Sequence, residues 1–128
     1  IAKRYEDREA LVTLATSAHP KVMFGSDSAP HPKDAKENCG CAAGVFTSPI
    51  AIQVLAELFE KHNKLENLEK FISINATNIY NLKRTNKTIN LIKKDFVVPQ
   101  DYRFENEIVV PMYSKETLSW SIDSIIQG

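Results

Sequence analysis

The sequence predicts an α/β fold, and three features of its first half carry that prediction. A helical pattern over Asp7–Ser17 is followed by a short apolar run within Lys21–Ser26, and a strong helix start follows at Ser48-Pro49. The run is too short for a helix and lies between a proline and a glycine, so it is typical of a buried strand. A helix that leads into a buried strand is the repeating unit of α/β proteins.

The first predicted helix spans roughly Asp7 to Ser17. Glu6 and Asp7 stand where acidic side chains favour a helix N-terminus, and His19-Pro20 ends the pattern. Its apolar residues recur at helical spacing: Ala10, Leu11, Leu14, Ala15 and Ala18. Residues 1–3 are expected to end a preceding strand or its loop.

Polar residues crowd the C-terminal end of the predicted strand: Ser26, Asp27, Ser28 and His31. Two prolines, Pro30 and Pro32, stiffen the turn that follows. An acid and an imidazole just past a buried parallel strand occupy the position where α/β folds place their chemistry. The alternative is that Asp27 and Ser28 cap the next helix, as such residues often do.

A long loop and a well-marked helix come next. The loop from Pro30 to Thr47 shows no hydrophobic period, and loops of that length are usually functional. The helix from Ser48 to Lys61 starts with an N-cap serine followed by proline. Its expected buried face consists of Ile50, Ala51, Val54, Leu55, Leu58 and Phe59, whereas Gln53, Glu57, Glu60 and His62 are expected to face water.

The remainder of the chain predicts short elements. Leu65 to Ile72 indicates a short helix, and Asn75 is expected to cap another that extends to Asn81. Short strand pieces are expected around Ile89 and Leu91, over Phe96–Val98 and over Ile108–Val110. Trp120, Ile122 and Ile125 are expected to pack this tail against the body.

The composition limits the classes of partner that the protein can have. Sixteen basic and sixteen acidic residues balance, and no basic stripe is visible, which argues against nucleic acid or an anionic membrane as a partner. No apolar stretch approaches the roughly 18 residues of a membrane span. Cys39 and Cys41 are too close in sequence for an unstrained disulfide, so free thiols in a reducing cytoplasm are the simplest account. A zinc site at this pair is the weaker alternative, because zinc sites usually need more ligands.

Two motifs carry a family resemblance. Phe24-Gly-Ser-Asp-Ser-Ala-Pro-His31, followed by Lys36-Glu37 and Cys39-Gly-Cys41-Ala42, resembles the last-strand signature of the dihydroorotases, closest to their shorter bacterial form within the amidohydrolase superfamily. The resemblance continues through the helix after Ser48 to Trp120 and covers nearly the whole chain.

The resemblance implies a fold class: the C-terminal part of a (β/α)8 metal-dependent hydrolase barrel of the TIM type with a small irregular extension. Residues 1–82 would form the last β/α units, including the active-site loop 28–47, and residues 83–128 the extension. A whole barrel needs about 250 residues, so an N-terminal remainder of the same protein is expected. A homodimer is also implied.

The resemblance further implies reversible hydrolysis of L-dihydroorotate to N-carbamoyl-L-aspartate with two zinc ions. Asp27 would act as the catalytic acid–base group and ligate one zinc. His31 would hold the substrate carboxylate, and Ala42, or its neighbour Ala43, would contact the substrate. Most zinc ligands are expected upstream, so this chain alone should not catalyse.

Two rival functions remain open at this point. A hydantoinase or dihydropyrimidinase shares the strand-end aspartate but lacks the full run to His31. A non-catalytic relative would keep the barrel as a binding scaffold. A free-standing binding module is weaker, because only one buried strand is convincing.

Overall fold

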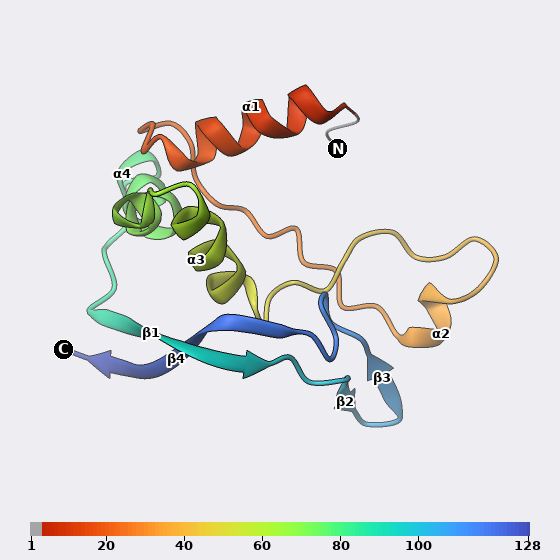
Figure 1. Ribbon diagram of the computed structural model, residues 1–128. Helices are drawn as coiled ribbons and strands as arrows, with labels where there is room; N and C mark the ends of the chain where they lie inside the picture. Colours follow the sequence, from red (N-terminus) through yellow and green to blue (C-terminus); the bar gives the residue numbers. More distant parts are fainter. Residues whose placement is uncertain (1–3) are drawn as a thin grey trace. The chain divides into compact units, whose positions relative to one another are not determined.

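The computed structural model describes residues 4–128 (Figure 1), so the expectation for residues 1–3 lies outside the described residues. The chain divides into two compact units, each built from segments that are discontinuous in sequence. The first comprises residues 4–25, Leu55–Thr88 and Ile125–Gly128, and the second comprises Ser26–Val54 and Ile89–Ser124. Each unit is therefore described by itself.

In the first unit, helix α1 (Tyr5–Thr16) confirms the first predicted helix and begins two residues earlier than expected. Glu6 and Asp7 lie in its first turn, as the sequence indicates. Thr16 is buried at its end, and its hydroxyl donates a hydrogen bond to the Val12 carbonyl at 3.0 Å.

The predicted strand Lys21–Ser26 is wrong for this structure, because residues 22–27 belong to no strand ladder. A parallel strand needs a neighbouring strand, and none flanks this segment within residues 4–128. Its apolar residues still find partners. Phe24 donates its backbone N–H to the Phe71 carbonyl at 2.9 Å, and its ring centroid lies 6.1 Å from that of Phe71, which in turn packs on Phe59.

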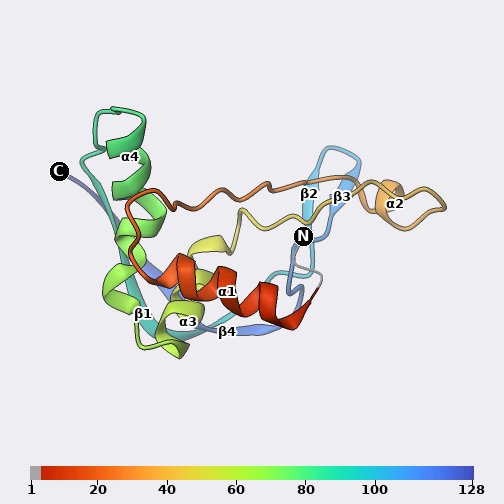
Figure 2. The ribbon, with the colours of Figure 1, turned by 90° about the horizontal axis from the view of Figure 1, so that it is seen from above.

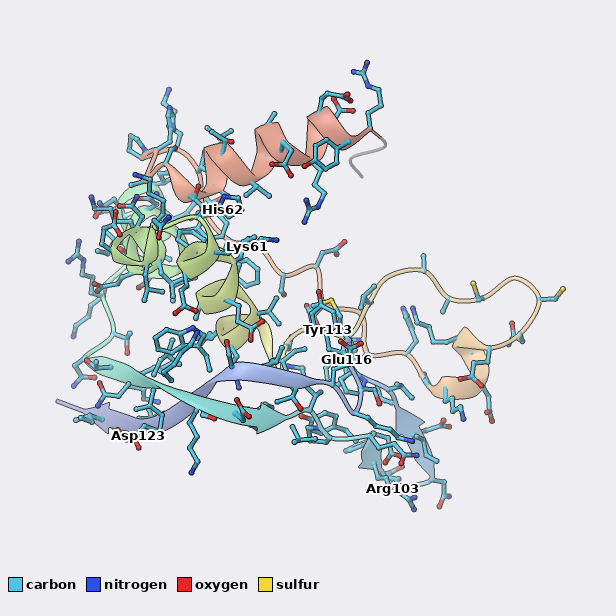
Figure 3. The ribbon with its side chains drawn as sticks, in the orientation of Figure 1. Lys61, His62, Arg103, Tyr113, Glu116 and Asp123 are labelled. Carbon is cyan, nitrogen blue, oxygen red and sulfur yellow. The ribbon has the colours of Figure 1, made fainter. Side chains whose placement is uncertain are left out.

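Helix α3 (Ala51–Lys61) confirms the helix predicted after Ser48 but begins three residues later. A turn closed by a bond from Ile50 N–H to the Thr47 carbonyl at 3.1 Å precedes it. Gln53 is 3% exposed, which contradicts its predicted place on the water-facing side. The reason is that it lies on the i, i+3 row between Ile50 and Ala56, which are both fully buried. The C-terminal end of α3, with Lys61 and His62, is labelled in Figure 3.

A continuous helical segment follows. It consists of η1 (Leu65–Asn67), the π-helix η2 (Lys70–Ile74) and α4 (Asn75–Ile79), in the region where the sequence predicts short helices. Asn75 is no N-cap, however, because its φ of −62° and ψ of −43° are helical. Its buried side-chain amide instead donates to the carbonyls of His19 at 3.0 Å and Val22 at 2.7 Å.

The C-terminal region holds longer strands than the sequence predicts. Strand β1 (Lys87–Val97) pairs with β4 (Thr117–Gln127), each eleven residues long. Backbone bonds from Gly128 to Asn86 at one end and from Val98 to Glu116 at the other make the pair antiparallel. Between them, β2 (Tyr102–Phe104) and β3 (Glu107–Val109) form a hairpin.

The core of the second unit is small. Ile50, Val98 and Leu118 are buried against one another, with Val54, Phe96 and Met112 packed at the edge. Trp120 is half-buried and lies under the Lys93 ammonium, 5.0 Å from its ring centroid.

Ile122 and Ile125 are 38% and 63% exposed within the described chain, and their packing against the body stays a prediction. The two-stranded sheet β1–β4 has two faces, and the rest of the described chain covers only part of each. Exposed polar residues lie on the strands, among them Asp123 on β4 and Arg103 on the β2–β3 hairpin (Figure 3). None of the helices in residues 4–128 combines the length and apolar character needed to cross a membrane.

Candidate functional site

The candidate site lies in the second unit, where two segments run side by side. Ala29 donates its N–H to the Val45 carbonyl at 3.0 Å, and Ser28 and Val45 form an isolated parallel bridge. The Ser28 hydroxyl oxygen accepts bonds from the N–H groups of Thr47 and Ser48, each at 3.0 Å. The polar run after Gly25 is thereby fixed to the turn that starts α3.

The alternative that Asp27 and Ser28 cap the next helix is wrong, because no side-chain cap bond reaches the helical turn at Lys33–Lys36. The N–H groups that the Ser28 hydroxyl accepts, across nineteen and twenty residues, belong to the turn that precedes α3 at Ala51. Hydrogen bonds that pair these backbone donors stabilise that turn. Ser28 is therefore structural, and it positions the residue that precedes it.

Asp27 lies at the exposed start of this segment. Its φ of 43° is in the left-handed region, which aspartate tolerates better than most residues. Within residues 4–128, no hydrogen bond or ion pair reaches the Asp27 carboxylate. This carboxylate is thus available to a ligand, a metal ion or a proton.

His31 follows four residues later on the same segment. Its N–H donates to the Ala29 carbonyl at 3.0 Å, which closes a tight turn, and its side chain is exposed. Helix α2 (Lys33–Lys36) begins directly after Pro32 and lies beside β3 in both views of the ribbon (Figures 1 and 2). The predicted loop 28–47 is thus interrupted by one helical turn.

Ala42 lies on the second of the two segments and is half-buried. Its N–H donates to the Ala35 carbonyl at 2.9 Å, and its carbonyl accepts from the Lys36 ammonium at 2.9 Å. Because this N–H is already used, a backbone donor for a ligand has to come from another residue. Ala43, the alternative contact, is exposed.

Gly44 lies close to Ala29, where the two segments meet. Its φ is 94°, and a Cβ built on it would lie 2.5 Å from the Ala29 Cβ. Only glycine meets both conditions without strain. The Lys36 ammonium also donates to the Gly44 carbonyl, a role that the sequence analysis missed because nothing in the spacing signals it.

The described residues supply one good metal ligand at this site. Cys39 and Cys41 are free and exposed, and no group of three or more His, Cys, Asp or Glu side chains gathers within residues 4–128. His19 is engaged locally, since its Nδ1 accepts from the Lys21 N–H at 3.2 Å. The Asp27 carboxylate fits as one oxygen ligand, and a two-zinc centre would need further ligands from outside these residues.

No family model matches. The dihydroorotase of Helicobacter acinonychis is 48% identical over 126 residues, which is 98% of this chain and 37% of that protein. The dihydroorotase of Aliivibrio fischeri is 46% identical over 123 residues, or 95% of this chain and 36% of that protein.

Two solved structures are similar as well. The dihydroorotase of Campylobacter jejuni has a TM-score of 0.85 and 50% identity over 97% of this chain and 36% of that structure. The dihydroorotase of Saccharomyces cerevisiae, solved in complex with 5-fluoroorotic acid, has a TM-score of 0.93 and 36% identity over all of this chain and 36% of that structure.

These similarities, with the mixed helix and strand content, place the chain among segments of hydrolytic enzymes. The enzymes are the dihydroorotases, and this chain is homologous to their C-terminal part. It spans about 37% of the length of the curated relatives that it matches.

Proposed function

We propose that this chain is the C-terminal part of a dihydroorotase, which hydrolyses L-dihydroorotate reversibly to N-carbamoyl-L-aspartate in pyrimidine biosynthesis. The observation that carries the proposal is the 48% identity over 98% of the chain. The matched length includes Asp27 and Ala42. The segments that carry them are joined by the bond from the Ala29 N–H to the Val45 carbonyl and by the bond from the Thr47 N–H to the Ser28 hydroxyl. In this proposal residues 1–82 complete a (β/α)8 barrel, and residues 83–128 form an extension of it.

In the proposed reaction, Asp27 moves the proton. Hydrolysis forms a bond between water oxygen and the ring carbonyl carbon and breaks the bond from that carbon to nitrogen. The exposed Asp27 carboxylate takes the proton from the attacking water and passes it to the departing nitrogen. Ring closure runs the same transfer backwards.

The site would hold two zinc ions, with Asp27 as a ligand to one of them. When bound, the metal lowers the pKa of a coordinated water towards about 7 and draws charge from the carbonyl oxygen. The remaining ligands belong to the longer protein. The described residues contribute the carboxylate and the fixed backbone that carries it.

His31 is proposed to bind the substrate carboxylate. Its exposed imidazole stands on a turn closed by its own backbone bond to Ala29, so the position is defined without using the side chain. The yeast relative was solved with 5-fluoroorotic acid, an acid of the same ring type, which supports an anionic ring as the ligand class. Ala42 or Ala43 is proposed as the contact on the second segment. A cytoplasmic homodimer is part of the same proposal.

The experiment compares substrates on the purified full-length protein. Hydrolysis of L-dihydroorotate should greatly exceed hydrolysis of hydantoin and dihydrouracil, and removal of zinc by a chelator should abolish it. A preference for hydantoin or dihydrouracil would assign the protein to the hydantoinase or dihydropyrimidinase group instead. No turnover of any of these by zinc-loaded protein would favour the non-catalytic scaffold.

A further inference from the structure

Lys36 stands out among the basic residues of the second unit, because its ammonium is directed at backbone carbonyls. It is the last residue of α2 and donates to the carbonyls of Ala42, at 2.9 Å, and Gly44. In the opposite direction, the Ala42 N–H donates to the Ala35 carbonyl at 2.9 Å. Helix α2 and the segment 42–44 are thus tied in both directions.

The tied segment lies against the segment that carries Asp27 and His31. Gly44 approaches Ala29 so closely that no side chain fits between them, and Val45 accepts the Ala29 N–H. A displacement of residues 42–44 would therefore be transmitted to the turn between Asp27 and His31. Three donors on one ammonium suit this role, because a lysine can serve two carbonyls at once.

Lys33 shows what an ordinary lysine on the same helix does. It forms an i, i+4 ion pair with Glu37 at 3.7 Å, and both side chains are largely exposed. Lys36 is half-buried by comparison and spans six and eight residues to its acceptors. Lys33 is thus a solvated surface charge, whereas Lys36 holds the loop through bonds to its backbone carbonyls.

We propose that Lys36 is a positioning residue that holds segment 42–44 in the conformation required for substrate binding. The inference rests on the proposed function for its kinetic consequence, but its structural part does not. Lys36 itself touches no reacting atom in this proposal; it acts through the carbonyls of Ala42 and Gly44.

The kinetic test uses the zinc-loaded full-length protein with Lys36→Met, Lys36→Arg and, as a matched control on the same helix, Lys33→Met. Lys36→Met should raise KM for L-dihydroorotate about tenfold, because charge-assisted bonds hold the binding segment. Its kcat should fall far less, and its zinc content and melting temperature should stay near those of the parent. Lys36→Arg keeps a charged donor and should recover part of the affinity, and Lys33→Met should behave like the parent.

A second measurement does not depend on activity. Amide hydrogen exchange of the peptide covering residues 40–46 should be faster in Lys36→Met than in Lys33→Met. The segment loses the bonds to the Ala42 and Gly44 carbonyls, so the Ala42 N–H is held less firmly against the Ala35 carbonyl. Unchanged exchange would overturn the proposal for Lys36, whether or not the parent protein is active. A parent protein that turned over no dihydroorotate would contradict only the proposed function. Faster exchange with an unchanged KM in an active enzyme would also overturn it, because the segment would then be held for stability alone.

Discussion

At the scale of single residues, Ser28 holds the turn that precedes α3. Its hydroxyl oxygen accepts the N–H groups of both Thr47 and Ser48. Ser28→Ala should therefore lower the free energy of unfolding by about 0.5–1.5 kcal/mol, the usual net worth of a hydrogen bond, whereas Ser48→Ala should change it little. Urea unfolding of the two variants checks this. A larger cost for Ser48→Ala would reinstate the local cap.

Asp27 is the residue on which the proposed chemistry depends. Asp27→Asn keeps the size of the side chain but removes the base, so kcat should fall at least about a hundredfold. Because the side chain is exposed and makes no bond within residues 4–128, the melting temperature should hardly move. Steady-state kinetics at matched zinc content is the measurement. Near-normal activity of a correctly loaded Asp27→Asn would remove Asp27 from the mechanism.

His31 allows a sharper test of binding. His31→Ala should weaken binding of dihydroorotate by the worth of one hydrogen bond to a charged group, about 1.5–3 kcal/mol, and leave zinc content intact. Affinity measured by titration, together with metal analysis, separates the two effects. A loss of zinc with unchanged affinity would make His31 a metal ligand.

At the scale of elements, Asn75 links the helical segment to the chain that leads into the site. Its amide donates to the carbonyls of His19 and Val22, and the residue is 5% exposed. Asn75→Ala would leave those carbonyls without this donor, which costs about 1–3 kcal/mol of stability when such groups are buried. Asn78→Ala, an exposed change on the same helix, is the control. Equal unfolding midpoints for the two variants would show that the amide contributes nothing.

The helices and strands also show which parts of the fold can be predicted from the sequence. Helix α3 was predictable from its hydrophobic period, which is a local signal, although Pro49 lies in the turn before it. The burial of Gln53 was not, since it depends on which side of the helix the rest of the chain covers. The segment Lys21–Ser26 is apolar enough for a strand, yet strand formation needs a neighbour to pair with. β1 and β4 were underestimated, because a pair exposed on much of both faces shows little alternation.

The candidate site was predictable in its parts and not in its connections. Motif resemblance pointed to Asp27, His31 and Ala42. In the structure Asp27 and His31 lie on one segment, and Ala29 of that segment bonds to Val45, which follows Ala42 on the other segment. The bonds of Ser28 and Lys36 join residues up to twenty positions apart. Such pairings arise from tertiary structure, so no local pattern reveals them.

At the scale of the whole molecule, the chain matches about 37% of its curated relatives' length. Within residues 4–128 no group of three or more metal-ligating side chains gathers. The 128-residue chain produced alone should therefore show no measurable hydrolysis of dihydroorotate, whereas the full-length protein should show it. Parallel assays in the presence of added zinc test this. Turnover by the short chain would mean that the site is complete without the upstream ligands.

The close approach of Gly44 to Ala29 restricts which sequences this site can explore. A library randomised at both positions should return almost only glycine at position 44, whatever stands at position 29, because the backbone there has a φ of 94°. Position 29 should favour small side chains, since the Ala29 Cβ faces the Gly44 backbone closely. Among the proposed contact positions of this chain, residues 31 and 43, whose side chains are exposed, would then be the ones left free to vary.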